Sequence, residues 1–201
     1  MKGANISKHQ HLAWSPSLDQ ITRRSFLCQT TSLILIGAAP ALCSSAVPTL
    51  ASAPPTQSSW RRCSKCNLLF YDGYRDKGRC PAGGGHAVFG RFDYVLTYDD
   101  SNGPGQGDWR FCRKCKAIFF NGYPAKGVCP LGAGHEAAGY NFFLFHDRKP
   151  AGNEVENWRY CNKCSALFFD NASATSVCPK GERHVAQGYK FVLRIQGGNV
   201  D

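Results

Sequence analysis

The stretch Trp109–His135, WRFCRKCKAIFFNGYPAKGVCPLGAGH, is the part of the sequence that decides the fold. It holds three cysteines and one histidine in the spacing C-x2-C-x13-C-x5-H. The same spacing recurs 49 residues earlier and 49 residues later, so the chain carries three copies of one unit. The members of the three sets are Cys63, Cys66, Cys80 and His86; Cys112, Cys115, Cys129 and His135; and Cys161, Cys164, Cys178 and His184.

Each set has the composition and spacing of a structural zinc site. Thiolates and imidazole suit Zn²⁺, and four such ligands complete its tetrahedron. The two residues between Cys63 and Cys66 allow both sulfurs to face one centre from a tight turn, and a Cys-Pro turn with His86 supplies the other half. A site closed by four protein ligands keeps no open position for catalysis. We therefore expect three Zn²⁺ ions per chain, in structural rather than catalytic sites.

Other uses of the cysteines explain less of the pattern. A redox C-x-x-C motif leaves the third cysteine and the histidine without a role. A zinc deaminase needs an H-x-E motif ahead of P-C-x-x-C, and the sequence has none. Disulfides fit poorly, because nine of the eleven cysteines follow Pro54 and an odd number cannot pair fully within one chain. Iron in place of zinc stays open as an alternative.

The formal net charge of +10 is a weak argument for nucleic-acid binding. From Pro54 onward the sequence has 20 Lys or Arg and 13 Asp or Glu residues, a formal charge of +7. A Zn²⁺ ion bound by three thiolates and one neutral imidazole carries −1, so three such sites leave about +4. Part of the basicity therefore balances the metal sites, and we expect no nucleic-acid partner.

Residues 1–53 are expected to be an export signal followed by a linker. The segment Thr22–Leu27, TRRSFL, resembles the twin-arginine signal consensus S/T-R-R-x-F-L. The apolar stretch from Phe26 to Cys43 is too short and too polar for a stable membrane span, and small residues accumulate through Ala53. We expect a protein exported through the twin-arginine route, periplasmic or secreted, with no membrane span in its mature form.

Residues 54–201 are expected to form one domain of three β repeats, at about 60–99, 109–147 and 158–196. In each repeat a Trp-Arg-x-Cys segment precedes the C-x-x-C turn, an apolar run follows it, and a second apolar run closes the unit. The joints at 100–108 and 148–157 are rich in Gly, Pro, Asn and Asp and are expected to be turns, and 54–59 a linker.

These patterns predict an all-β fold. A unit of about 40 residues lacks the core to fold alone, so metal binding is expected to supply much of the folding free energy. We predict three zinc-stapled β repeats of 49-residue period, packed as a compact pseudo-threefold domain, either a small propeller or a trefoil-like ring. Independent beads on a string are the alternative.

Two further residue types recur at fixed places beside the ligands. A lysine lies inside each C-x-x-C: Lys65, Lys114 and Lys163. It is expected to offset the negative site and to lower the thiol pKa values, or else to be a solvated turn residue. A tryptophan stands three residues before each first ligand: Trp60, Trp109 and Trp158. We expect these side chains to pack in the core or to shield the metals, rather than to stack on a ligand.

The loop between the two halves of each metal site differs among the repeats. Repeats one and two carry a tyrosine and a lysine there, Tyr74 with Lys77 and Tyr123 with Lys126, whereas repeat three has neither. Surface loops tolerate such drift. The functional interpretation is that the tyrosine offers a stacking face and the lysine a charged donor to a glycan or an anionic polymer.

The whole pattern, W-R-x-C-x-K-C-x-x-x-F followed by C-P-x-G-x-x-H, resembles a repeat of uncharacterised secreted bacterial and fungal proteins, usually found in tandem. The resemblance covers almost all of the chain after the predicted signal. It implies zinc-ribbon-like metal binding and export, and it implies no particular activity.

Three classes of function follow for testing. The first, which we favour, is an exported, non-enzymatic binding or structural module that recognises a glycan or other cell-envelope polymer. No Ser/His/Asp set, carboxylate pair or phosphate-binding loop stands out in the sequence, which argues against the second class, an enzyme with a site between repeats. The third class is a zinc-finger-type nucleic-acid binder, which the predicted export disfavours.

Overall fold

The computed structural model describes residues 52–99, 104–171 and 176–196. By internal contacts the chain divides into two units, Met1–Pro48 and Thr49–Asp201, and only the second contains described residues. The predicted twin-arginine signal therefore lies outside the described residues. Across the described ranges every regular element is a β-strand, and no helix there is long and apolar enough to cross a membrane.

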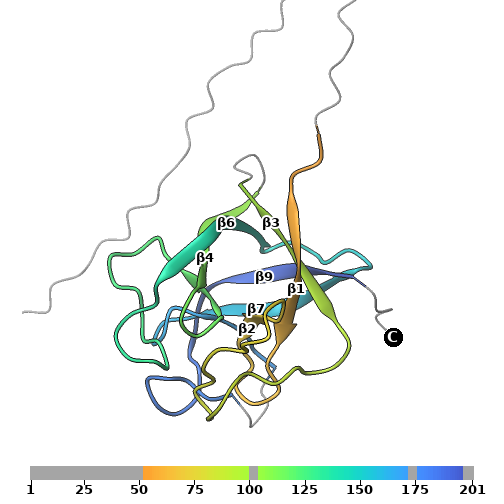
Figure 1. Cartoon of the computed structure of the whole chain (residues 1–201). Helices are drawn as coiled ribbons and strands as arrows, with labels where there is room; N and C mark the ends of the chain where they lie inside the picture. The colour runs from red at the N-terminus through yellow and green to blue at the C-terminus, as the bar shows by residue number, and fades with distance from the viewer. Residues whose placement is uncertain (1–51, 100–103, 172–175, 197–201) are drawn as a thin grey trace, which may run out of the picture. The chain divides into compact units, whose positions relative to one another are not determined.

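The described residues form nine strands, three from each repeat, and Figure 1 shows strands of all three repeats gathered into one body. The strands are β1 Thr56–Arg62, β2 Leu69–Tyr71 and β3 Asp93–Tyr98 in repeat one; β4 Gly105–Cys112, β5 Ile118–Phe120 and β6 Ala137–His146 in repeat two; and β7 Glu154–Cys161, β8 Leu167–Phe169 and β9 Ala186–Gln196 in repeat three. The first strand of each repeat pairs antiparallel with the other two, so each repeat is a small three-stranded sheet.

The tryptophan of each repeat has equivalent strand partners in all three sheets. Trp109 lies opposite Phe120 on one side and Phe142 on the other. The C-x-x-C segment forms the turn of the hairpin between the first two strands, as the sequence predicts. The register therefore places the two cysteines of this turn at the same end of every repeat.

The strands begin earlier than the sequence predicts. Residues 54–59, 100–108 and 148–157 were expected to be turns or linker, but β1, β4 and β7 start at Thr56, Gly105 and Glu154. The reason is a β-bulge just before each tryptophan, where one polar residue has a positive φ. These residues are Ser59 (φ 68°), Asp108 (φ 61°) and Asn157 (φ 70°). A bulge residue in this conformation is of a type that is common in turns, although the strand continues past it.

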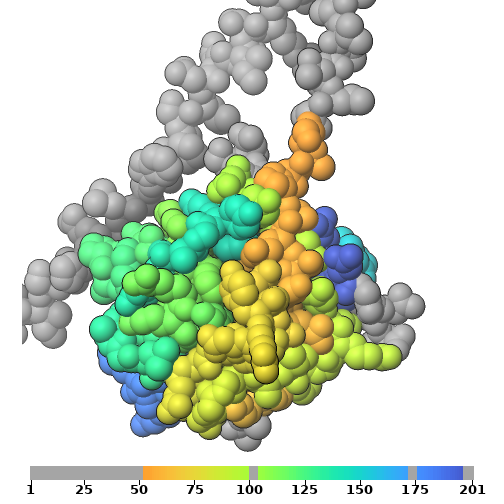
Figure 2. Space-filling view, in the orientation of Figure 1, coloured from red at the N-terminus to blue at the C-terminus, as the bar shows by residue number. Residues whose placement is uncertain are grey.

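Two closed rings of backbone pairing join the repeats. In the first, β3 pairs with β6, β6 with β9 and β9 with β3. In the second, single bridges link the short strands β2, β5 and β8, and three equivalent hydrogen bonds close the circle: Tyr71 N to Lys116 O, Phe120 N to Ser165 O, and Phe169 N to Asn67 O, at 2.9, 2.9 and 3.0 Å. The predicted compact pseudo-threefold arrangement is confirmed, and beads on a string do not describe the domain. In Figure 2 repeat one lies directly against repeat two.

The short strands separate two buried clusters. Along β2 and the residue before it, Leu68 and Phe70 face a cluster that contains all nine described cysteines, while Leu69 and Tyr71 face a cluster that contains the tryptophans. This is the alternation of side chains expected of a strand buried on both faces. The domain thus has a sulfur-rich layer and an aromatic layer on opposite sides of the second ring.

Candidate metal centres

All three sets of predicted ligands come together as buried clusters. Within each set the ligand atoms lie within 4.8 Å of one another. Cys63 Sγ is 3.9 Å from Cys80 Sγ, and the second cysteine of each set is 3.4–3.6 Å from the histidine Nδ1. A tetrahedral Zn²⁺ with ordinary bond lengths separates two sulfurs by about 3.8 Å and sulfur from nitrogen by about 3.6 Å. Each cluster therefore fits one Zn²⁺ ion, three per chain, as predicted from the spacing.

Two tight turns hold the four ligands of each set. In repeat one, Asn67 N–H donates to Cys63 O at 2.9 Å, and Gly83 N–H donates to Cys80 O at 3.0 Å. Asn67 has a φ of 62°, which reverses the chain directly after the second cysteine. Lys116 and Ser165 take the same conformation in the other repeats. The geometry of each turn is thus set by its own backbone bonds.

The lysine inside each C-x-x-C joins the two turns. Lys114 Nζ donates to Gly132 O at 2.9 Å, and Lys65 and Lys163 make the same bond to Gly83 and Gly181 at 2.5 and 2.6 Å. Each bond runs from the first turn of a site to the second. The lysine is therefore more than a solvated turn residue, because it connects the two halves of the ligand set and brings a positive charge beside them.

Each ligand histidine is supported by a phenylalanine that the sequence analysis left without a role. Phe119 stacks on His135 with ring centroids 4.8 Å apart, and Phe70 and Phe168 stack in the same way on His86 and His184. The signal was present in the sequence, since a phenylalanine stands four residues after the second cysteine of every repeat. This stacking fixes the plane of the imidazole ring and so the direction of Nδ1.

The clusters bring ionisable groups together in a way that favours bound metal. A hydrogen bond from Cys66 lowers the pKa of the Cys63 thiol well below its usual range, whereas burial raises the pKa of Cys66. Although burial lowers the pKa of His135, hydrogen bonds with Cys112 and Cys129 raise it to about 9. Each cluster thus favours one buried thiolate, at its first cysteine, and a divalent cation would neutralise this charge while displacing the protons of the other ligands.

Glycines let one repeat approach the metal turn of the next. A Cβ added at Gly127 (φ +64°) would lie 2.1 Å from Cys164 O, and one added at Gly78 (φ +65°) would lie 2.2 Å from Cys115 O. Beside Gly127, His135 Nε2 lies 3.1 Å from Cys164 O, where the ring N–H can donate. The metal centres are therefore linked through backbone contacts between neighbouring repeats.

The tryptophans belong to the aromatic layer. Trp60, Trp109 and Trp158 are fully buried there, apart from the cysteine cluster, so they pack in the core and do not shield the metals. Each one meets a ring of the following repeat edge to face, at 4.9–5.1 Å between centroids: Trp60 on Phe142, Trp109 on Phe191 and Trp158 on Tyr94.

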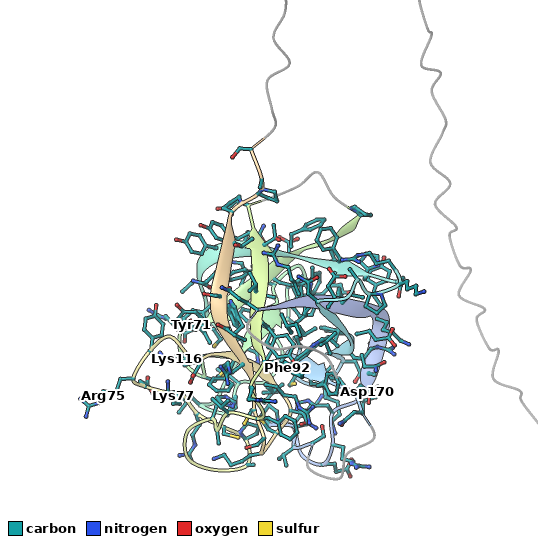
Figure 3. The ribbon with its side chains drawn as sticks, turned by 90° about the vertical axis from the view of Figure 1, so that its right-hand side faces the viewer. Tyr71, Arg75, Lys77, Phe92, Lys116 and Asp170 are labelled. Atoms are coloured by element: carbon teal, nitrogen blue, oxygen red, sulfur yellow. The ribbon has the colours of Figure 1, made fainter. Side chains whose placement is uncertain are left out.

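The two tyrosines proposed from the sequence line two of the surface pockets that lie between repeats. Tyr74 lines a cavity of about 280 Å³ between repeats one and two, and Tyr123 one of about 370 Å³ between repeats two and three. Tyr74 is 52% exposed and Tyr123 54%. Figure 3 shows the first interface, where Tyr71 and Lys116 lie side by side and Arg75 projects away.

The structure places the lysines of these loops elsewhere. Lys77 Nζ donates to Asp72 O at 2.8 Å and forms an ion pair with the Asp72 carboxylate. Lys126 Nζ donates to the backbone oxygens of Asn121 and Tyr123, both at 2.6 Å. These ammonium groups hold their own loops, and neither lysine lines either of these two pockets.

Comparison with known proteins adds no relative to this description. No family model, no curated protein and no solved structure matches the chain.

Proposed function

We propose that this protein is an exported, non-enzymatic binding module, in which three zinc ions hold a rigid β scaffold and an aromatic surface recognises a glycan of the cell envelope or the medium. The observation that carries the proposal is the pair of surface pockets with exposed tyrosines, Tyr74 and Tyr123, at two interfaces between repeats. Exposed aromatic rings fixed over a buried aromatic layer are suited to stacking on a ligand.

The metal sites support a structural role rather than a catalytic one. Each set supplies four buried protein ligands, which is the number that closes a tetrahedral site. A bound metal would have no coordination position for water or substrate. The zinc ions would then act by stabilising the fold, as they do in other small metal-bound domains.

Glycan binding is tested by retention of the zinc-loaded protein on insoluble polysaccharides and on a glycan array. We expect retention that survives moderate salt, because stacking does not depend on charge. A salt-dependent shift of duplex or single-stranded DNA, without glycan retention, would favour a nucleic-acid binder instead. Hydrolysis of the bound polysaccharide would favour an enzyme.

Export is a separate part of the proposal, and it rests on Arg23 and Arg24, which precede the nine cysteines that follow Pro54. The twin-arginine route carries folded proteins, so zinc could be loaded in a reducing compartment before the thiols meet an oxidising one. Replacing both residues with lysine should retain the protein inside the cell. Normal export of the double variant would point to a different route.

A further inference from the structure

We infer that the domain has two equivalent sites for uncharged sugar rings, one between repeats one and two and one between repeats two and three, and that in the described part of the third interface Arg62 covers the corresponding aromatic ring. This inference rests on the proposed glycan-binding function and adds the ligand class and the number of sites.

The two pockets are built from corresponding residues. The floor of the first is formed by Tyr71, Phe111 and Phe142, and the floor of the second by the residues 49 positions later, Phe120, Tyr160 and Phe191. Gln57 and Gln106 also correspond, and each accepts a hydrogen bond from a buried tryptophan Nε1 at 3.2 Å. Since the glutamine oxygen is taken, its amide nitrogen remains as a donor toward the pocket.

Each pocket has one exposed tyrosine from either repeat among its lining residues, and we call these the rim tyrosines: Tyr74 and Tyr140 in the first pocket, Tyr123 and Tyr189 in the second. Tyr140 and Tyr189 are 44% exposed, and a second ring backs each: Tyr140 stacks on Tyr98 at 3.9 Å, and Tyr189 on His146 at 3.7 Å. Such backing holds the exposed rings in place before a ligand arrives, which reduces the ordering cost of binding.

The lining selects an uncharged ligand. Among the described residues, only aromatic, glutamine and glycine residues line the two pockets. An anion would therefore find no cation among the lining residues, and the nearby Lys116 ammonium already pairs with the Asp76 carboxylate at 3.4 Å. A quaternary ammonium ion would be disfavoured at the first pocket, because Lys116 Nζ already lies 5.7 Å from the Tyr74 ring and 5.8 Å from the Phe111 ring.

A pyranose ring matches this combination of surfaces. Its C–H face is apolar and packs on aromatic rings, and its hydroxyls bond to the amide and phenol groups. The cavity volumes lie near the lower end of the range for small-ligand pockets, roughly 300–1,000 Å³. Each pocket is therefore suited to one or two residues of a neutral oligosaccharide.

The third interface differs, in its described residues, because an arginine covers the corresponding aromatic ring. Arg62 stands where repeats two and three have Phe111 and Tyr160. Its side chain is 8% exposed, and its guanidinium lies 3.9 Å from the ring centre of Phe89 and 4.5 Å from that of Phe169. It also donates to Asn67 Oδ1 at 3.2 Å. Phe169 is the counterpart of the pocket-floor residues Tyr71 and Phe120, so Arg62 covers the ring that lines the pocket at the other two interfaces. The space that remains beside Phe169 is about 90 Å³ and is otherwise lined by polar and charged residues.

The test is calorimetric titration of the zinc-loaded protein with cellohexaose, xylohexaose and chitohexaose. Choline and hexagalacturonate serve as charged probes. We expect at least one neutral sugar to bind with a stoichiometry of two. Tyr74→Ala should reduce the stoichiometry to one, and Tyr74→Ala with Tyr123→Ala should weaken binding about tenfold or more, with zinc content and melting temperature unchanged. Retention on an insoluble polymer should fall more steeply than solution affinity, since two linked sites act together.

Two matched controls keep the test specific. Phe89→Ala removes a ring of similar exposure at the third interface, and Arg75→Ala changes the loop beside Tyr74 without touching the pocket. Both should bind like the unchanged protein. Unchanged binding by the double tyrosine variant would overturn the two-pocket assignment while leaving glycan binding in place. A preference for choline or hexagalacturonate would overturn the uncharged-ligand assignment, and no binding to any glycan would overturn this inference and the proposed function together.

Discussion

At the scale of single residues, close packing between repeats depends on positions where no side chain fits. Gly127→Ala would place a Cβ 2.1 Å from Cys164 O and force an alanine to a φ of +64°. We expect the free energy of unfolding to fall by about 3 kcal/mol, because strain and a backbone clash add. Chemical denaturation measures the change. Gly152→Ala is the control, since nothing lies within 4 Å of the added atom there. Equal stability of both variants would contradict the contact.

Some residue roles could be predicted from the sequence, and others could not. The metal ligands were predictable, because C-x2-C and C-x5-H are local spacings that only a turn can satisfy. The position of Trp109 in the aromatic layer was not predictable, since it depends on the strand register. The use of Lys77 and Lys126 was not predictable either, because a lysine that bonds to its own loop looks the same in sequence as one that faces a ligand.

At the scale of elements, each metal site consists of two turns that are joined by a lysine. Lys114→Met should remove the bond to Gly132 O and keep the side-chain length. We expect the zinc affinity of the middle site to fall about tenfold or more, because outer contacts orient metal ligands. Competition with a chelator measures the affinity, and Lys149→Met removes one charge at an exposed position outside the turns as control.

If Lys114→Met and Lys149→Met release zinc alike, the bond from Lys114 to Gly132 O does not hold the ligands in place.

The existence of the strands could be predicted from the apolar runs, but their starts could not. The bulge residues Ser59, Asp108 and Asn157 are polar turn formers by type, and only the structure shows them inside β1, β4 and β7. The pockets were beyond sequence reasoning for a related reason, since each takes its two rim tyrosines from different repeats.

At the scale of the whole molecule, two closed rings of pairing make the repeats interdependent. The compact ring was the favoured prediction from the sequence, but the alternative could be rejected only by the pairings between repeats. Cys112→Ser should therefore destabilise all three repeats together, by several kcal/mol, and not the middle one alone. Hydrogen exchange of each repeat checks this prediction. Exchange that rises only within residues 105–146 would show that the repeats unfold independently.

The central claim is that three Cys3His clusters, fused into one buried layer, each hold a zinc ion. The most direct test is elemental analysis combined with native mass spectrometry of protein purified without added metal. We predict close to three zinc ions per chain and nine cysteines free of disulfides. A zinc content near zero, with the same cysteines paired as disulfides, would contradict the claim.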